Sequence, residues 1–97
     1  MKETLISFCI VNLNAKSHLI SCLKSISMFT KCGSFEIIVV DNNSNDGSIE
    51  FIRYQYPEVK LIINLRNDGY TKAINKALKL SKGKYKVVLN PDTELMP

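Results

Sequence analysis

Acidic side chains stand at the ends of two apolar runs in this 97-residue sequence. Asp41 directly follows the apolar run 37–40, and Asp92 follows the run 87–89 after an asparagine and a proline. A carboxylate at the position of Asp41 can accept hydrogen bonds from a ribose or from the N–H of a pyrimidine ring. A carboxylate such as Asp92 is a hard ligand that leaves positions on a divalent cation for phosphate oxygens and water. The two residues therefore suggest a site for a nucleotide and a metal ion.

Each of these residues also has a purely structural interpretation. The stretch 41–48 is rich in Asn, Ser and Asp, which build Asx turns before helices without any ligand. We expect Gly47 to adopt unusual backbone angles, and Ser48 or Asp46 to cap the following helix. Asp92 can equally start a turn or cap a helix. The residue types alone leave both interpretations open.

A possible phosphate site precedes the third segment with helical spacing. The tripeptide Asn-Asp-Gly at 67–69 would place free N–H groups there, and Arg66 or Lys72 could add positive charge. The sequence contains neither the glycine-rich dinucleotide fingerprint nor a P-loop. The only histidine, His18, is expected on the surface, so no nucleophilic triad is supported.

Seven alternating elements would position these residues. Short apolar runs predict strands at 5–11, 36–40, 59–64 and 85–90. Three- and four-residue apolar spacing predicts helices at 17–29, 48–56 and 70–80. Strands that alternate with helices indicate an α/β fold, a Rossmann-like three-layer α/β/α arrangement with a parallel sheet covered on both faces. Such sheets bind ligands beyond the carboxyl ends of their strands, where the polar clusters fall.

Composition indicates one soluble globular domain. Hydrophobic residues make up 45% of the chain and charged residues 23%, and no apolar run is long enough to cross a membrane. The net charge is +4, but the basic residues are scattered and no nucleic-acid motif is present, so specific nucleic-acid binding is not expected. The odd number of cysteines, three, without a C-x-x-C pair indicates reduced thiols. The absence of a signal-peptide cleavage site predicts a cytoplasmic location.

Five segments together resemble the amino-terminal half of a family 2 glycosyltransferase with the GT-A fold. They occur in family order and are Ile10–Asn14, Ile38–Ser48, Asn67–Tyr70, Asn75 and Leu89–Thr93. They are most similar to the rhamnosyltransferase-like branch, which typically has N-Y-N, V-V-D-N-x-S-x-D-G-S and L-N-P-D-T. The resemblance implies that residues 1–97 form the donor-binding half of a GT-A domain and that the acceptor half is absent.

The resemblance also assigns roles to individual residues. The implied substrate-binding residues are Val11, Asn12, Asn14, Asp41, Asn67, Gly69 and Asn90. Val11 and Asn12 would line the nucleotide pocket, and Asp41 would hydrogen-bond the base or the ribose. Asn67 and Gly69 would shape the pocket wall, with Asn75 helping to hold the loop.

The implied cofactor is Mg²⁺ or Mn²⁺ bridging the diphosphate of the donor. Asp92 would be the last residue of the family's D-x-D element and would bind the metal. Two departures from the family pattern concern this site. Asn90 replaces the first carboxylate of D-x-D. Leu13 replaces the aromatic residue that family members often have there to stack on the nucleotide base.

The expected activity is inverting transfer of a sugar from a UDP- or dTDP-sugar, for cell-surface polysaccharide synthesis. The family's catalytic base would lie beyond Pro97, so we expect no transfer by this fragment alone and a homodimer through an uncovered sheet edge. A membrane-peripheral position stays open for the full-length enzyme. The alternative is a non-catalytic nucleotide-binding or assembly module. A nucleotidyltransferase is disfavoured because residues 12–16 do not form its glycine-rich basic loop.

Overall fold

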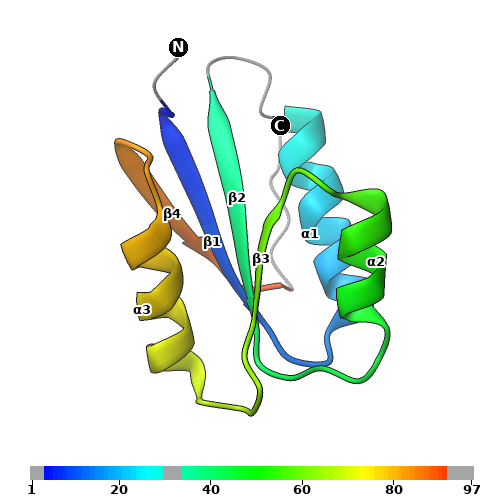
Figure 1. Ribbon diagram of the computed structural model, residues 1–97. Coiled ribbons are helices and arrows are strands. Elements are labelled where there is room, and N and C mark those ends of the chain that lie inside the picture. The colour runs from blue at the N-terminus through cyan, green and yellow to red at the C-terminus, as the bar shows by residue number, and fades with distance from the viewer. Residues whose placement is uncertain (1–3, 30–33, 92–97) are drawn as a thin grey trace.

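The computed structural model describes residues 4–29 and 34–91, and strands alternate with helices throughout this part of the chain (Figure 1). The elements are β1 (Ile6–Asn12), α1 (Lys16–Phe29), β2 (Phe35–Asp41), α2 (Ser48–Gln55), β3 (Lys60–Ile63), α3 (Tyr70–Leu80) and β4 (Tyr85–Leu89). Every boundary lies within one residue of the predicted one. The predicted order of elements is therefore confirmed.

The four strands form one parallel sheet in the order β3-β2-β1-β4. The first two connections step outward from β1 to β2 and β3, whereas the third crosses back to β4. Right-handed crossovers in opposite directions place their helices on opposite faces. Accordingly, α1 and α2 cover one face of the sheet and α3 covers the other (Figure 1). The predicted α/β/α fold class is confirmed, and the direction of the connections changes between β1 and β4.

Two apolar layers fill the space between the sheet and the helices. Successive strand residues point to opposite faces, so β2 sends Val39 toward α1 and α2 and Val40 toward α3. Because both faces are covered, Ile37 to Val40 are all buried, as their uninterrupted apolar run predicts. On α3, the small residues Ala73 and Ala77 are fully buried and let the helix lie close to β1 and β2.

Cys9 and Cys22 are buried in different layers of the core. Burial raises the pKa of the Cys9 thiol, and the nearby Glu36 carboxylate adds to this effect, against a smaller opposing effect of Lys86. Cys32 lies outside the described residues. Cys9 agrees with the predicted reduced thiols, whereas the state of the other two cysteines stays a prediction.

A polar cluster at the amino-terminal edge of the sheet fixes the start of β4. The Ser7 hydroxyl donates to the Glu36 carboxylate at 2.6 Å and accepts the N–H of Gly83 at 2.7 Å. A Cβ on Gly83 would lie 2.5 Å from the Ser7 Oγ, so only glycine fits this approach. Glu36 also accepts the N–H of Lys82 and the Lys60 ammonium. This cluster holds the α3–β4 turn against β1 and β2.

Among the described residues, we find no helix that combines the length and the apolar character needed to cross a membrane.

Candidate functional site at the carboxyl edge of the sheet

Polar residues from all four strands meet at the carboxyl edge of the sheet. Asn12 and Asp41 end β1 and β2, while Asn64 and Asn90 directly follow β3 and β4. Backbone hydrogen bonds continue past the ends of the strands. The N–H of Asn42, the residue after β2, donates to the carbonyl of Asn12 at the end of β1, at 2.9 Å. The predicted gathering of polar side chains at this edge is therefore observed in the described part of the chain.

Asp41 lies at the end of β2, but its side chain is buried rather than exposed at the rim of the sheet. Its Oδ1 accepts the side-chain amide of Asn12 at 2.9 Å and the Ser44 hydroxyl at 2.8 Å. Its Oδ2 accepts the Ser44 N–H at 2.7 Å. Three internal donors thus satisfy a carboxylate that would otherwise be costly to bury. In this structure Asp41 joins the end of β1 to the loop that follows β2.

Asn12 leaves one acceptor without a partner. Its amide nitrogen donates to Asp41 and, at 3.2 Å, to the Ser44 hydroxyl. Its Oδ1 is buried and accepts no hydrogen bond from the described residues, the one such side-chain atom among them. A buried acceptor without a donor is unusual in folded proteins, and binding of a ligand N–H or O–H is one way to satisfy it.

Asn14 and Asp46 hold the first two loops of this edge together. Asn14 adopts a left-handed φ of 49°, and its Oδ1 accepts the Asn45 N–H at 2.8 Å. Asp46 accepts the N–H of Lys16, at the start of α1, and the N–H of Ser48, at the start of α2, each at 3.0 Å. Both residues act on the backbone of neighbouring loops in this structure.

The predicted helix cap is corrected in one detail. The N-cap residue of α2 is Gly47, with the expected positive φ of 88°, and neither Ser48 nor Asp46 occupies that position. Asp46 instead reaches past the cap to the N–H and hydroxyl of Ser48. Burial alone would raise the pKa of Asp46, but hydrogen bonds from Ser48 and from the Lys16 N–H outweigh it and lower the pKa.

A chain of amides holds the loop between β3 and α3. Lys76 Nζ donates to Asn64 Oδ1 at 2.6 Å, and Asn64 Nδ2 donates to Asn42 Oδ1 at 2.7 Å. Asn42 Nδ2 then donates to the Gly69 carbonyl at 3.2 Å. The sequence predicts that Asn75 helps to hold this loop, but its side chain is exposed on α3. The buried residues Ala73, Ile74 and Ala77 form the side of α3 that faces the sheet, so Asn75 points away from it. Asn42 takes that role.

Gly69 shapes the end of the same loop. Its φ of 82° and ψ of 167° are accessible essentially only to glycine, and no atom lies within 4 Å of the place where a Cβ would stand. The backbone conformation, not the lack of space, therefore requires glycine. The Gly69 N–H is not free for phosphate, because it donates to Asn67 Oδ1 at 2.9 Å, and Arg66 pairs with Asp68 at 3.0 Å.

These loops border an open hollow, which we call the edge groove. One part has a volume of about 320 Å³, and a second part has about 360 Å³. The two parts share Val11, Ala15, Tyr70 and Pro91. The first part is also lined by Leu13, Asn42, Asn67 and Gly69, and the second by His18 and Asn90. The groove therefore lies beside the point where the direction of the strand connections changes.

The structure divides the predicted site residues into three groups. Those that line the edge groove are Val11, Asn67, Gly69 and Asn90. Asn12 and Asp41 are buried next to lining residues, and Asn14 borders a separate hollow with Lys16 and Asp46. The metal-binding candidate Asp92 lies outside the described residues. Within the described ranges, no three His, Cys, Asp or Glu side chains gather to form a metal site.

Several lining residues were missed as site residues from the sequence, chiefly Tyr70, Ala15 and Pro91. Tyr70 is half exposed and begins α3 directly after Gly69. Their positions in the sequence could have indicated this role, because each of the three residues lies in or next to a loop that follows the carboxyl end of a predicted strand. His18 is exposed as predicted, but it also borders the groove.

Comparison with known proteins identifies the family. Residues 7–97 match the family model described as Glycosyl transferase family 2. The chain belongs to this family. It is 33% identical over 98 residues to a PGL/p-HBAD biosynthesis glycosyltransferase of Mycobacterium bovis (strain BCG / Pasteur 1173P2), covering 98% of this chain and 38% of that protein. It is 31% identical over 87 residues to the uncharacterized glycosyltransferase YibD of Escherichia coli (strain K12), covering 87% and 25%, respectively.

Solved structures show the same fold. The chain resembles S. aureus TarS in complex with UDP, with a TM-score of 0.83, 22% identity, and coverage of 92% of this chain and 28% of that one. It also resembles the mannosyltransferase PcManGT of Pyrobaculum calidifontis in complex with GDP-Man and Mn²⁺, with a TM-score of 0.77, 22% identity, and coverage of 93% and 28%. The GT-A fold and the predicted family are confirmed, while the rhamnosyltransferase-like branch stays a prediction. The chain spans 25–38% of the length of the curated relatives named above.

Proposed function

We propose that the edge groove binds the nucleotide of a nucleotide-diphospho-sugar, as the donor half of an inverting family 2 glycosyltransferase. The observation that carries the proposal is the position of the groove, at the carboxyl edge of a parallel sheet and beside the change in strand connection. Family membership supports sugar transfer as the reaction. The similar structures of TarS and PcManGT were solved with UDP and with GDP-Man and Mn²⁺, respectively.

The groove offers both apolar and polar contacts to a nucleotide. Leu13 and Tyr70 are 42% and 47% exposed, respectively, so they can pack against a base although Leu13 itself is not aromatic. Asn12 Oδ1 can accept a donor from the base or ribose. In the proposal, Asp41 contacts the ligand by exchanging its hydrogen bond with the Ser44 hydroxyl for one with a ligand donor. UDP and dTDP are the nucleotides we favour.

The groove also suits a metal-bound diphosphate at one end. Asn90 lines it directly after β4, and the chain continues from there through Pro91 to Asp92. A single carboxylate with substrate phosphates and water is a common ligand set for Mg²⁺, and Mn²⁺ accepts similar oxygen ligands. Asp92 would hold this ion, with the Asn90 side chain nearby to orient a phosphate oxygen. When bound, such an ion stabilises negative charge on the departing diphosphate.

We further propose that these 97 residues bind the donor but do not transfer sugar alone, because they span so small a share of their relatives. The second candidate is a nucleotide-binding or assembly module without catalysis. The proposed role of the whole protein is cell-surface polysaccharide synthesis. The free, buried Cys9 supports a reducing compartment such as the cytoplasm. Among the described residues β4 pairs with β1 alone, and this supports self-association.

Calorimetric titration tests the proposed function. The chain is titrated with UDP, dTDP and GDP, each with and without Mn²⁺, and the titrations are repeated with Asp92→Ala. Glu50→Ala, which removes an exposed carboxylate from α2, is the matched control. We expect metal-dependent binding of one nucleotide that Asp92→Ala loses and Glu50→Ala keeps. Failure of every nucleotide to bind would contradict the donor site. Binding without sugar transfer by a chain as long as the relatives would favour the non-catalytic module.

A further inference from the structure

The first residue of α3 belongs to the side of the helix that faces the sheet. Four residues share the spacing i, i+3, i+4 and i+7, namely Tyr70, Ala73, Ile74 and Ala77. This spacing places side chains on one side of an α-helix. The last three are buried against the sheet, whereas Tyr70 borders the edge groove. The helical period therefore directs the Tyr70 ring over the carboxyl edge of the sheet, whichever segments cover that edge.

Contacts on both sides of Gly69 fix the point from which this ring extends. The Gly69 N–H donates to Asn67 Oδ1 at 2.9 Å. Its carbonyl accepts Asn42 Nδ2 at 3.2 Å and the Ala73 N–H at 3.3 Å. Side chains of a helix lean toward its amino terminus, so the Tyr70 ring leans toward this anchored loop. Neither core layer includes Tyr70, and among the described residues its ring contacts no other ring.

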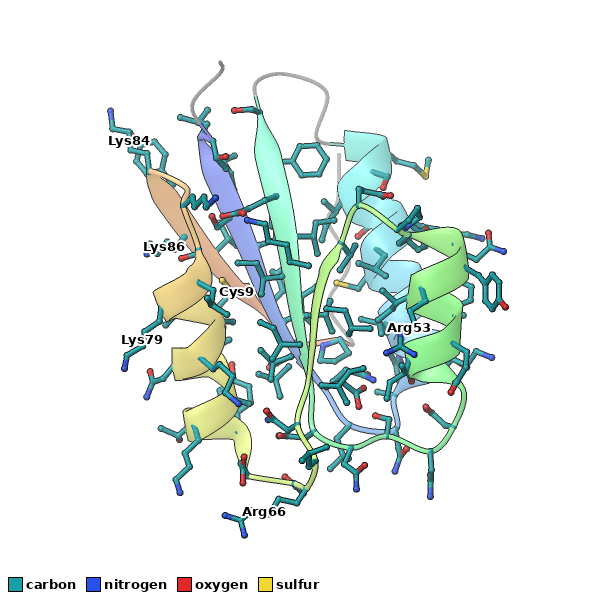
Figure 2. All side chains as sticks on the ribbon, viewed as in Figure 1. Cys9, Arg53, Arg66, Lys79, Lys84 and Lys86 are labelled. Atoms are coloured by element: carbon teal, nitrogen blue, oxygen red, sulfur yellow. The ribbon has the colours of Figure 1, made fainter. Side chains whose placement is uncertain are left out.

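Tyr70 is the one phenylalanine, tyrosine or tryptophan among the described residues that line the groove, and it borders both parts. An arginine can also stack on a base, but neither arginine of the chain is a lining residue. Figure 2 shows Arg66 on the outer side of the loop before α3, and Arg53 on α2, across the sheet from α3. Arg66 pairs with Asp68 at 3.0 Å. His18 borders only the second part of the groove. Tyr70 is therefore the side chain best suited to cover the face of a base.

We propose that Tyr70 stacks on the base of the nucleotide and supplies a large part of its affinity. The inference rests on the proposed function, because it requires a nucleotide in the edge groove. Stacking on an aromatic ring strengthens binding whichever base is present, since every base has a π-face. Tyr70 thus determines how tightly a nucleotide binds and not which base is chosen. The aliphatic side chains of Val11 and Leu13, which line the same part of the groove, add apolar contacts to the base.

Calorimetric titration of variants in the presence of Mn²⁺ tests the proposal. Tyr70→Leu keeps an apolar side chain but removes the ring. It should bind each of UDP, dTDP and GDP that the parent binds roughly tenfold more weakly. Tyr70→Phe keeps the ring and should bind like the parent. Tyr54→Leu removes a ring from an 85% exposed position on α2 and is the matched control, which should also bind like the parent. Urea unfolding shows whether each variant keeps the fold.

A signal from the ring itself separates stacking from a loss of structure. When 3-fluorotyrosine replaces tyrosine, the fluorine resonance that is missing from Tyr70→Phe belongs to Tyr70. Addition of the nucleotide should shift this resonance with the dissociation constant that calorimetry gives. Inorganic pyrophosphate has no base and should shift it much less. A tyrosine that only supports the fold would show no such difference between the two ligands.

Failure of the inference and failure of the proposed function give different results. If the parent binds a nucleotide but Tyr70→Leu binds it equally tightly, or the Tyr70 resonance does not move, stacking is overturned and the groove site stands. If the parent binds no nucleotide, both are overturned. The same variants in a chain as long as the relatives give a second test. A loss confined to the 97-residue chain would show that another segment occupies Tyr70 in the longer chain, and it would overturn the inference.

Discussion

At the scale of single residues, Lys76 determines how the groove loop is held. Its ammonium can only donate, so the Asn64 oxygen faces it and the Asn64 NH₂ group faces Asn42. The Asn42 oxygen therefore accepts, which leaves its NH₂ group to donate to the Gly69 carbonyl. The charge of Lys76 therefore orients the side-chain amides of Asn64 and Asn42 and, through them, the loop that lines the edge groove.

We expect Lys76→Met to loosen this loop. The substitution leaves Asn64 Oδ1 buried without its donor, which should cost about 1–3 kcal/mol of stability. Urea unfolding measures that loss, and nucleotide titration should show weaker binding, since the groove loop is less ordered. Lys72→Met, one turn earlier on the exposed face of α3, is the control and should change stability by less than about 0.5 kcal/mol. Identical effects of the two variants would contradict the proposed role of Lys76.

The same residues show what the sequence could and could not predict about the site. The position of Asp41 at the end of a strand followed from the apolar run that precedes it. The burial of its carboxylate did not follow, since its Asn12 partner lies 29 residues away. Likewise, the pattern around Asn75 could not show that Asn42, 27 residues before Gly69, holds the loop. Hydrogen bonds between distant segments depend on strand order, which local patterns do not contain.

At the scale of elements, Glu36 joins β2 to β3 and to the turn before β4. Burial alone would raise its pKa, but hydrogen bonds from the Lys60 ammonium, the Lys82 N–H and the Ser7 hydroxyl outweigh it and lower the pKa from 4.5 to about 2. A pKa that is lower in the folded state means that the ionised form stabilises the fold. This stabilisation is complete above pH 4.5 and is lost as the pH falls toward about 2.

We expect Glu36→Gln to remove most of this pH dependence. At pH 7 the variant should be less stable by roughly 2–3 kcal/mol, and the difference should shrink as the pH is lowered toward 3. Urea unfolding at a series of pH values measures both effects. Glu58→Gln, at an exposed position before β3, should follow the parent curve. A constant difference between parent and Glu36→Gln at all pH values would show that the carboxylate charge is not the cause.

The sequence predicted every element but not which strands form the borders of the sheet. The apolar runs of β2 and β4 look alike, because each contains consecutive β-branched residues. In the structure β2 is buried on both faces, whereas Tyr85, Lys86 and Val88 of β4 are exposed. The difference arises from the third crossover, which carries β4 past β1 to the border. Hydrophobic periodicity indicates whether a segment forms a helix or a strand, but not which strands lie beside it in the sheet.

At the scale of the whole molecule, the described part of the chain is compact but has an unpaired strand edge. The Cα radius of gyration is 12.5 Å, which is about the value for a folded domain of this length. Nevertheless, in the described part of the chain β4 pairs with β1 alone, so one of its backbone edges is free. A free strand edge favours pairing with another strand, and lysines beside it oppose such pairing. Lys84 and Lys86 stand at this edge and therefore set the conditions for self-association.

We expect self-association through β4 to strengthen with salt. Pairing two β4 edges brings Lys84 and Lys86 of two copies together, so the repulsion between them must be screened before the strands can join. Sedimentation velocity at increasing salt should therefore show a growing dimer fraction. Val88→Lys adds a charge to the free edge and should keep the protein monomeric, whereas Tyr54→Lys adds the same charge on α2 and should not. A compact monomer at every salt concentration would contradict pairing at this edge.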